Sequence, residues 1–238
     1  MTLDEFNQEY HNVAGGGFER AMLRLSCEGY SRGIDIGAST GIFTFPMHLW
    51  LSQPCEILAF EPDPERASVI VDGQLDDISV HYVALGRDYN TATLFLPHNS
   101  LVKSDGDNRS IVVSVRKLND YYKEIPTVIK MDVEGAEGTI FEGGKKFLNG
   151  QTRWVFEFSP LGIALHGGWT GARILEELFA HQYCVYEVQH SARHLRPILP
   201  ETYQAFIGEF TRLDRFTTLW ALKQSDPLNS AREVFHLT

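Results

Sequence analysis

A carboxylate followed by a glycine-rich turn is the first feature of this chain that could do chemistry. Asp35 ends a short apolar run, and the turn after it contains Gly37, Ala38, Ser39 and Gly41. Glycine permits unusual backbone dihedral angles and a close approach of the backbone to a ligand. A carboxylate at Asp35 can hold a positive group such as an ammonium or a sulfonium, whereas it would repel a pyrophosphate. The alternative is an ordinary strand-to-helix turn with a solvated acid.

A second carboxylate, Glu61, follows the next apolar run, residues 56–60, and precedes Pro62. At the corresponding place in dinucleotide sites, an acid accepts hydrogen bonds from ribose hydroxyls. Glu61 can instead be a capping acid near a helix start, where the helix dipole favours negative charge. The turn and this acid together indicate a nucleotide-type cofactor site.

The densest charged patch is residues 130–137, Lys-Met-Asp-Val-Glu-Gly-Ala-Glu. Its carboxylates Asp132, Glu134 and Glu137 would repel one another in one cleft, so at least one pKa should be raised unless a cation offsets the repulsion. Lys130 can supply that cation. The alternative is a helix start enriched in acids.

Two later residues are further candidates for acid–base chemistry. Glu157 interrupts the apolar run 154–158, and an acid late in a central strand is costly unless it faces a partner or a polar cleft. A paired structural acid is an equal alternative for Glu157. His166 lies in the next segment and is the best placed of the histidines to act as a general base, because imidazole titrates near neutrality. A loop histidine without a role is the alternative for His166.

The composition limits the class of protein. The chain has 238 residues, 43% of them hydrophobic, which fits one large domain with a sizeable core. A net charge of −10 argues against sequence-independent nucleic-acid binding. The three cysteines match neither a disulfide framework nor a zinc motif, and no signal peptide or membrane-spanning run is visible. We therefore expect a cytoplasmic protein with no membrane partner.

Strands and helices are expected to alternate along the chain. We predict strands over residues 33–36, 56–60, 80–85, 128–133, 154–158, 183–188 and 217–222. We predict helices over residues 4–28 with a break at 15–17, and over 43–51, 64–72, 139–148 and 170–181. The remaining features are an inserted hairpin of residues 91–96 and 111–115, a Gly-rich loop over 161–168, and a mixed segment over 190–215 that covers the site.

This alternation predicts an α/β fold with a mostly parallel, doubly wound sheet. Ligands of such sheets bind outside the carboxyl ends of the strands. The strand-end residues are therefore the site candidates, namely Asp35 with its turn, Glu61, residues 84–86, residues 132–137 and residues 157–160. The predicted organisation is an N-terminal helical cap over residues 1–30, a main domain over 31–223 and a polar tail over 224–238.

At these residues the chain resembles the FkbM family of S-adenosylmethionine-dependent methyltransferases. The family's pattern is an Asp-x-Gly-Ala-Asn-x-Gly turn, a Glu-Pro-(Asn/Asp)-Pro strand end, a Lys-x-Asp-Val-Glu-Gly-Ala-Glu octet and a later strand with an internal Glu. This chain carries the pattern at residues 35–41, 61–64 and 130–137 and at Glu157, with Ser39 in place of the family's Asn. The shorter serine puts any contact made by that side chain in question.

The resemblance implies a Rossmann-like class I methyltransferase domain with an antiparallel last strand. It implies methyl transfer from S-adenosyl-L-methionine to a hydroxyl of a sugar or secondary metabolite. The cofactor would be held by the turn and the second acid, namely by Asp35, Gly37, Ala38, Ser39, Gly41, Glu61 and Pro62, with Ala84 and Leu85 beside the adenine. Asp132, also next to the cofactor, and Glu134 would orient the acceptor and take its proton, with Glu157 and His166 assisting.

Three alternatives stay open. A divalent cation such as Mg²⁺, held by Asp132, Glu134 and Glu157, is a secondary option, because hard cations favour oxygen ligands. A nicotinamide oxidoreductase shares the glycine turn, but no tyrosine here has a lysine four residues later, as short-chain dehydrogenases require. A non-catalytic module that binds cofactor or a partner protein would keep the same fold. The acceptor and the oligomeric state are left open.

Overall fold

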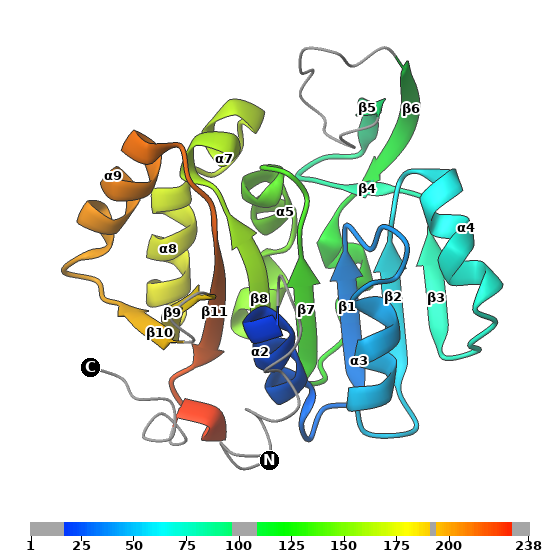
Figure 1. The fold of residues 1–238 in the computed structure, drawn as a ribbon, viewed down its shortest axis with the longest axis horizontal. Helices are drawn as coiled ribbons and strands as arrows, with labels where there is room; N and C mark the ends of the chain where they lie inside the picture. Colours follow the sequence, from blue (N-terminus) through cyan, green and yellow to red (C-terminus); the bar gives the residue numbers. More distant parts are fainter. Residues whose placement is uncertain (1–16, 97–108, 191–193, 230–238) are drawn as a thin grey trace.

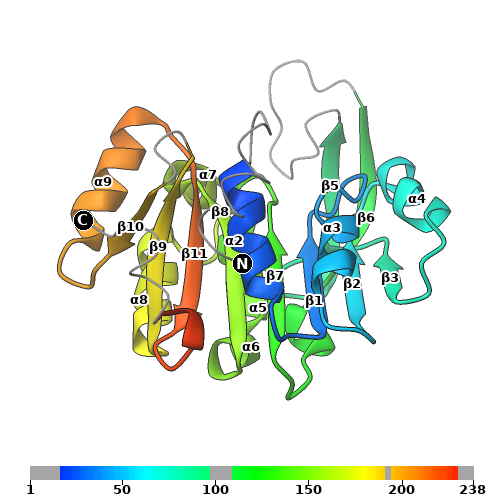
Figure 2. The ribbon, with the colours of Figure 1, turned by 60° about the horizontal axis from the view of Figure 1, so that its bottom comes forward.

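The structure of the chain, a computed structural model, describes residues 17–96, 109–190 and 194–229. An eight-stranded sheet in the order β10-β9-β11-β8-β7-β1-β2-β3 forms its centre, and helices cover both faces (Figures 1 and 2). A separate three-stranded sheet in the order β4-β6-β5 stands beyond the carboxyl ends of the central strands (Figure 1). The predicted α/β fold class is confirmed.

The core of the central sheet is parallel. The parallel strands are β3 (Ile78–His81), β2 (Glu56–Phe60), β1 (Arg32–Ile36), β7 (Thr127–Met131) and β8 (Thr152–Phe158). The last strand, β11 (Thr217–Lys223), is antiparallel to both β8 and β9 (Tyr183–Gln189), between which it lies. The edge strand β10 (His194–Ile198) is antiparallel to β9. An antiparallel last strand inside a parallel sheet is the arrangement that the resemblance implied.

The helices form two layers because each buries one apolar face against the sheet. One face carries α2 (Gly17–Cys27), α3 (Thr44–Trp50) and α4 (Pro64–Asp72). The other carries α5 (Glu137–Gly143), α6 (Lys145–Asn149), α7 (Pro160–His166), α8 (Gly171–Ala180) and α9 (Tyr203–Leu213). A 3₁₀ turn, η1 (Leu118–Tyr121), precedes β7. Local signals set several helix starts, since the side chain of Asp63 caps α4 and that of Thr170 caps α8.

The strand predicted over residues 80–85 is wrong, because two elements divide that segment. The strand β3 ends at His81, and β4 (Ala84–Leu85) leaves the central sheet to pair in parallel with β6 (Arg109–Arg116). The predicted hairpin is confirmed, since β5 (Asn90–Leu96) pairs with β6 in antiparallel register. The hairpin gives β4 a partner outside the central sheet, which a run of apolar residues alone does not reveal.

Two further expectations differ from the structure on the helical face. The Gly-rich segment 161–168 is mostly helix α7, because the Ser159 hydroxyl accepts a hydrogen bond from the Gly162 N–H and Pro160 occupies the first turn. The helix predicted over 139–148 is two helices, α5 and α6, which meet at Gly144. Glycine favours the end of a helix over its interior.

The C-terminal part also departs from expectation. The mixed segment 190–215 forms β10 and α9, and α9 packs Phe206 and Phe210 into the core beside α8. Beyond β11 the chain stays attached, because Asp226 is buried and forms an ion pair with Arg153 (Nε to Oδ2, 2.8 Å). The parts of the predicted cap and tail at residues 1–16 and 230–238 lie outside the described residues. In the described part of the chain, no helix has the length and apolar character needed to cross a bilayer.

Candidate active site

A cavity of about 270 Å³ opens at the carboxyl ends of β1, β2 and β7. Its walls come from the turn after β1, the end of β2, the chain around β4 and the segment after β7. The predicted site residues that line it are Gly37, Ala38, Ser39, Glu61, Pro62, Ala84, Leu85, Asp132 and Glu134. The remaining predicted residues, Asp35, Gly41, Glu157 and His166, do not line it.

The turn after β1 approaches the neighbouring strand ends closely. Gly37 has φ +79°, and a Cβ there would lie 1.9 Å from the carbonyl oxygen of Asp132. The N–H groups of Gly37 and Ala38 both donate to the carbonyl oxygen of Phe60 (2.9 and 3.0 Å). Ser39 also has a positive φ of 49°. Only a residue without a side chain fits at Gly37, and it brings the ends of β1, β2 and β7 together.

Glu61 is oriented by two backbone donors. Its Oε2 accepts from the N–H of Ser39 (2.9 Å), and its Oε1 accepts from the N–H of Asp63 (2.8 Å). The side chain is buried, and burial raises its pKa even though the two donors oppose that shift. A carboxylate oxygen has more than one acceptor site, so each oxygen can still accept a hydrogen bond from a ligand hydroxyl.

A further part of the cavity lining is apolar. Val83, Ala84 and Leu85 line it beside Leu94 of β5 and Ile140 of α5. Ala84 and Leu85 are buried. Leu94 and Ile140 were not predicted, because Leu94 comes from the inserted hairpin and Ile140 reads as an ordinary core residue of an amphipathic helix. An apolar lining combined with a hydrogen-bonding carboxylate is typical of a small-molecule site.

Asp35 lies behind the turn rather than in the cavity. Its side chain is fully buried, and its Oδ2 accepts a short hydrogen bond from the Thr44 hydroxyl at the start of α3 (2.6 Å). Burial raises the pKa of Asp35 to about 6, opposed by Thr44 and Lys130. In this structure Asp35 therefore contacts the helix start that follows the turn, and it makes no lining contact of the kind we expected.

Lys130 supplies the buried cation that the acidic patch was expected to need. Its Nζ lies 3.0 Å from Glu19 Oε1 on α2 and 3.4 Å from Asp132 Oδ2, and it also faces the Phe43 ring at 4.6 Å. Burial opposes the charge, but Glu19 and Asp132 outweigh it and raise the lysine pKa to about 12. No feature of the sequence marks Glu19 as the partner of Lys130, because the helix that carries Glu19 is far from this strand along the chain.

Four carboxylates gather where β7 and β8 end. Asp132 and Glu134 line the cavity, whereas the buried Glu137 and the half-buried Glu157 do not. Burial, followed by repulsion from Asp132, Glu137 and Glu134, raises the pKa of Glu157 to about 8. Burial also raises the pKa of Glu137 to about 7, although backbone N–H groups of its own turn oppose that shift. The expected repulsion is present, and it adds to burial, the larger cause, in raising the pKa values of Glu137 and Glu157.

His166 ends α7 close to this cluster. Its Nδ1 lies 3.1 Å from the carbonyl oxygen of Gly162, and its Nε2 is buried without a hydrogen-bond partner among the described residues. A Cβ on Gly135 would lie 2.6 Å from Nδ1, so the imidazole packs directly on the turn after β7. The proton positions of the two nitrogens depend on the tautomer.

A model of the methyltransferase FkbM domain matches residues 35–199, which include the whole cavity and the acid cluster. This chain belongs to the FkbM methyltransferase family. The FkbM-family chain is therefore a methyltransferase, and its family uses S-adenosyl-L-methionine. A search of curated proteins gave no match.

Solved structures similar to this FkbM-family chain include three methyltransferases. A precorrin-6y C5,15-methyltransferase from Geobacter metallireducens is 13% identical, with 86% of each chain covered and a TM-score of 0.45. An S-adenosylmethionine-dependent O-methyltransferase from Thermotoga maritima is 11% identical, with 89% of this chain and 66% of that chain covered and a TM-score of 0.45. An rRNA methylase from Streptococcus thermophilus is 12% identical, with 90% and 99% covered and a TM-score of 0.46.

The residues of the cavity fit S-adenosyl-L-methionine. Glu61 presents acceptor oxygens suited to ribose hydroxyls, and the apolar wall at Ala84 and Leu85 suits a flat base. Asp132 and Glu134 add negative charge for a sulfonium or ammonium group. The Mg²⁺ option is less well matched: among the described residues, the group whose metal-ligating atoms all lie within 4.8 Å of one another is His48, Cys55 and Asp77, not the acids of this site.

Proposed function

We propose that this FkbM-family chain is an O-methyltransferase that methylates a hydroxyl of a sugar or a secondary metabolite. The observation that carries the proposal is that the glycine turn, Glu61 and the carboxylates Asp132 and Glu134 all line one cavity. We assign the glycine turn and Glu61 to a cofactor half of the cavity, and Asp132 and Glu134 to an acceptor half. The two halves adjoin at the same strand ends. The net charge of −10 disfavours a polyanionic acceptor such as RNA and leaves small neutral or cationic acceptors.

The cofactor half is proposed to work by fixed geometry. Glu61 would accept hydrogen bonds from the two ribose hydroxyls, because backbone donors already orient its oxygens. The turn at Gly37 to Gly41 would bind the methionine part. Asp35 would act through Thr44, by holding the start of α3 against the turn. When bound, S-adenosyl-L-methionine supplies a methyl group that its sulfonium has already activated.

The acceptor half is proposed to orient a hydroxyl and remove its proton. Asp132 or Glu134 would accept the hydrogen bond of the acceptor hydroxyl and take its proton as the carbon–oxygen bond forms, the carbon–sulfur bond breaks and S-adenosylhomocysteine leaves. Lys130 Nζ lies 3.4 Å from Asp132 Oδ2, so a positive charge adjoins this carboxylate and can fix its position. Glu157 and His166 are proposed as positioning residues behind these acids. Alignment and exclusion of water then account for most of the rate enhancement.

Methyl transfer itself is tested with S-adenosyl-L-methionine carrying a labelled methyl group. The purified chain is incubated with small-molecule extracts, with protein and with RNA, and the label is followed by mass spectrometry. We expect label on an oxygen of a small hydroxyl compound. Label on RNA, on a nitrogen or on a carbon would contradict the proposal, and cofactor binding with no transfer in any fraction would favour the non-catalytic alternative.

The cofactor site is tested by Glu61→Gln. The amide replaces one acceptor oxygen by a donor that faces a backbone N–H, so a charged hydrogen bond is lost on both the protein and the ligand side. We expect the affinity for S-adenosylhomocysteine, measured by calorimetry, to fall at least about tenfold.

The matched control for this variant is Glu65→Gln, the same chemical change at an exposed position on α4 outside the cavity. It should leave the affinity unchanged. Thermal unfolding without ligand separates loss of binding from loss of folding. Equal affinities for the wild-type chain and Glu61→Gln, with both folded, would refute the ribose assignment.

A further inference from the structure

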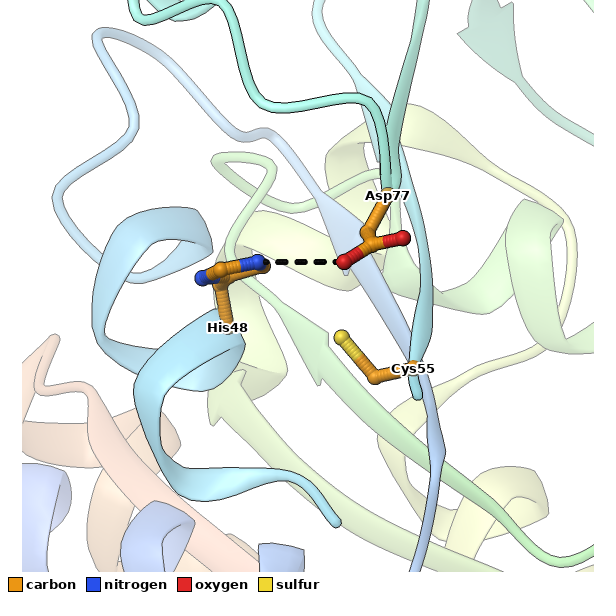
Figure 3. A group of neighbouring side chains, drawn as sticks. All are labelled: His48, Cys55 and Asp77. Carbon is orange, nitrogen blue, oxygen red and sulfur yellow. Dashed lines mark ion pairs between the residues drawn. The ribbon is translucent and has the colours of Figure 1, made fainter. Parts of the chain in front are cut away.

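Three side chains that can ligate a metal converge at the end of the sheet opposite to the cavity. His48 lies on α3, Cys55 directly precedes β2, and Asp77 directly precedes β3. Figure 3 shows the imidazole, the thiol and the carboxylate pointing toward one another. One ligand atom from each lies within 4.8 Å of the other two. Their separation along the sequence explains why no zinc motif is visible there.

The backbone around this group is held in place independently of any metal. The strands β2 and β3 pair in parallel, and the N–H of Ile57 donates to the carbonyl oxygen of Asp77 (2.8 Å). The side chain of Gln53 donates to the carbonyl oxygen of His48 (2.9 Å) and lies 3.4 Å from the Cys55 sulfur. The helix end and the two strand starts are therefore linked before the side chains meet.

One of the three separations already suits a tetrahedral ion, and the other two lie within 4.8 Å. Zinc binds nitrogen and oxygen at about 2.0 Å and sulfur at about 2.3 Å, so its ligand atoms stand roughly 3.3–3.5 Å apart. His48 Nε2 and Asp77 Oδ2 are already 3.4 Å apart. The sulfur completes a nitrogen, sulfur and oxygen set that suits zinc better than the hard cations Mg²⁺ and Ca²⁺. The Asp77 side chain is 43% exposed, so water can reach a fourth position.

We propose that His48, Cys55 and Asp77 bind one zinc ion that ties the C-terminal end of α3 to the starts of β2 and β3. The site is structural, because it lies at the opposite end of β2 from Glu61 and the cavity. Its effect on function is indirect: α3 begins directly after the glycine turn, so anchoring its far end restricts the motion of the turn.

The first measurement is the metal content of the full chain. Chelator-treated protein is incubated with zinc and desalted, and bound zinc is determined by elemental mass spectrometry. We expect one zinc ion per chain and a higher melting temperature in zinc than in chelator. Co²⁺ in place of zinc should give a thiolate-to-metal charge-transfer absorption. A wild-type chain that retains no zinc would overturn the proposal.

The ligand set is tested with Cys55→Ser, His48→Ala and Asp77→Asn. Each is expected to weaken zinc binding by at least about tenfold, and Cys55→Ser should abolish the charge-transfer absorption. Asp77→Asn keeps the shape of the side chain, so it still tests the ligand set if the change at the buried Cys55 impairs folding. The controls are Cys184→Ser and His181→Ala, a half-buried thiol and a histidine paired with Glu177 away from this group. Zinc binding equally affected by the controls would refute the assignment.

Discussion

At the scale of single residues, the site separates the carboxylates that contact the cavity from those behind it. Asp132 and Glu134 line the cavity, whereas Glu157 is half-buried and close enough to the other acids to be repelled by them. The sequence placed all of these acids at strand ends, but burial decides which ones hold a proton near neutral pH. The proton on Glu157 limits the negative charge that accumulates behind the acceptor half.

The variant Glu157→Gln tests whether the pKa of Glu157 is raised, through the effect of that shift on the stability of the fold. The folded-state pKa of Glu157 is raised from 4.5 to about 8, so its favourable contribution is complete only below about pH 4.5 and is lost as the pH rises through 8. The non-ionisable variant lacks this loss. Between about pH 5 and pH 8, we expect the free energy of unfolding of the variant to rise relative to that of the wild-type chain. The expected difference is about 2 kcal/mol after allowance for partial exposure.

Urea unfolding at several pH values measures the difference. The control Glu201→Gln removes an exposed acid, and its pH profile should follow that of the wild-type chain. Parallel profiles for Glu157→Gln and the wild-type chain would show that the Glu157 carboxyl has an ordinary environment.

At the scale of elements, the glycine turn joins three strand ends. A Cβ at Gly37 would lie 1.9 Å from a backbone oxygen of the segment after β7, and its φ of +79° is unfavourable for any other residue. Backbone atoms cannot rotate away as a side chain can, so the turn or the end of β7 must move. The cavity therefore depends on this one contact between elements.

Gly37→Ala is accordingly expected to destabilise the fold by about 2–4 kcal/mol, from strain at positive φ and overpacking together, and to abolish cofactor binding. Denaturant unfolding and calorimetry with S-adenosylhomocysteine measure the two effects. Gly208→Ala on α9 is the control, since a Cβ there meets nothing within 4 Å. That exposed helical change should be neutral or stabilising by up to about 1 kcal/mol. Similar unfolding midpoints for the two variants would contradict the close-contact argument.

At the scale of the whole molecule, Arg153 on β8 connects the two ends of the described chain. Its guanidinium pairs with Asp226 beyond the last strand and donates to the carbonyl oxygens of Ser26 and Glu28 at the end of α2 (2.9 and 2.8 Å). It also lies over the Tyr30 ring at 3.9 Å. A buried arginine with all these partners fastens α2 and the last residues to the sheet.

Asp226→Ala should therefore cost about 3–5 kcal/mol, because it leaves a buried guanidinium without its counter-ion. Urea unfolding of the full chain gives the value. The exposed ion pair of Asp88 with Lys117 offers a control, and Asp88→Ala should change stability by no more than about 1 kcal/mol. Equal losses in the two variants would show that the Arg153 pair contributes no more than a surface contact.

Much of the α/β framework could be predicted because its signals are local. The helix α4 has the predicted bounds, since Asp63 and Pro64 define its start, and β2 was bounded correctly by its apolar run. The division of residues 80–85 could not be predicted, because it depends on pairing between β4 and a strand that follows much later. For the same reason, the sequence did not reveal Glu19 as the partner of Lys130.

The order of glycines, acids and apolar runs by itself determined the family resemblance, the parallel sheet and the edge at which the site lies, because turn chemistry and strand periodicity depend on neighbours in the chain. Tertiary structure alone decided which side chains reach the cavity. It placed Asp35 against Thr44, Glu157 behind Asp132, and His48 beside Cys55 and Asp77. Burial and contact between distant segments are properties of the packed chain, and no local pattern encodes them.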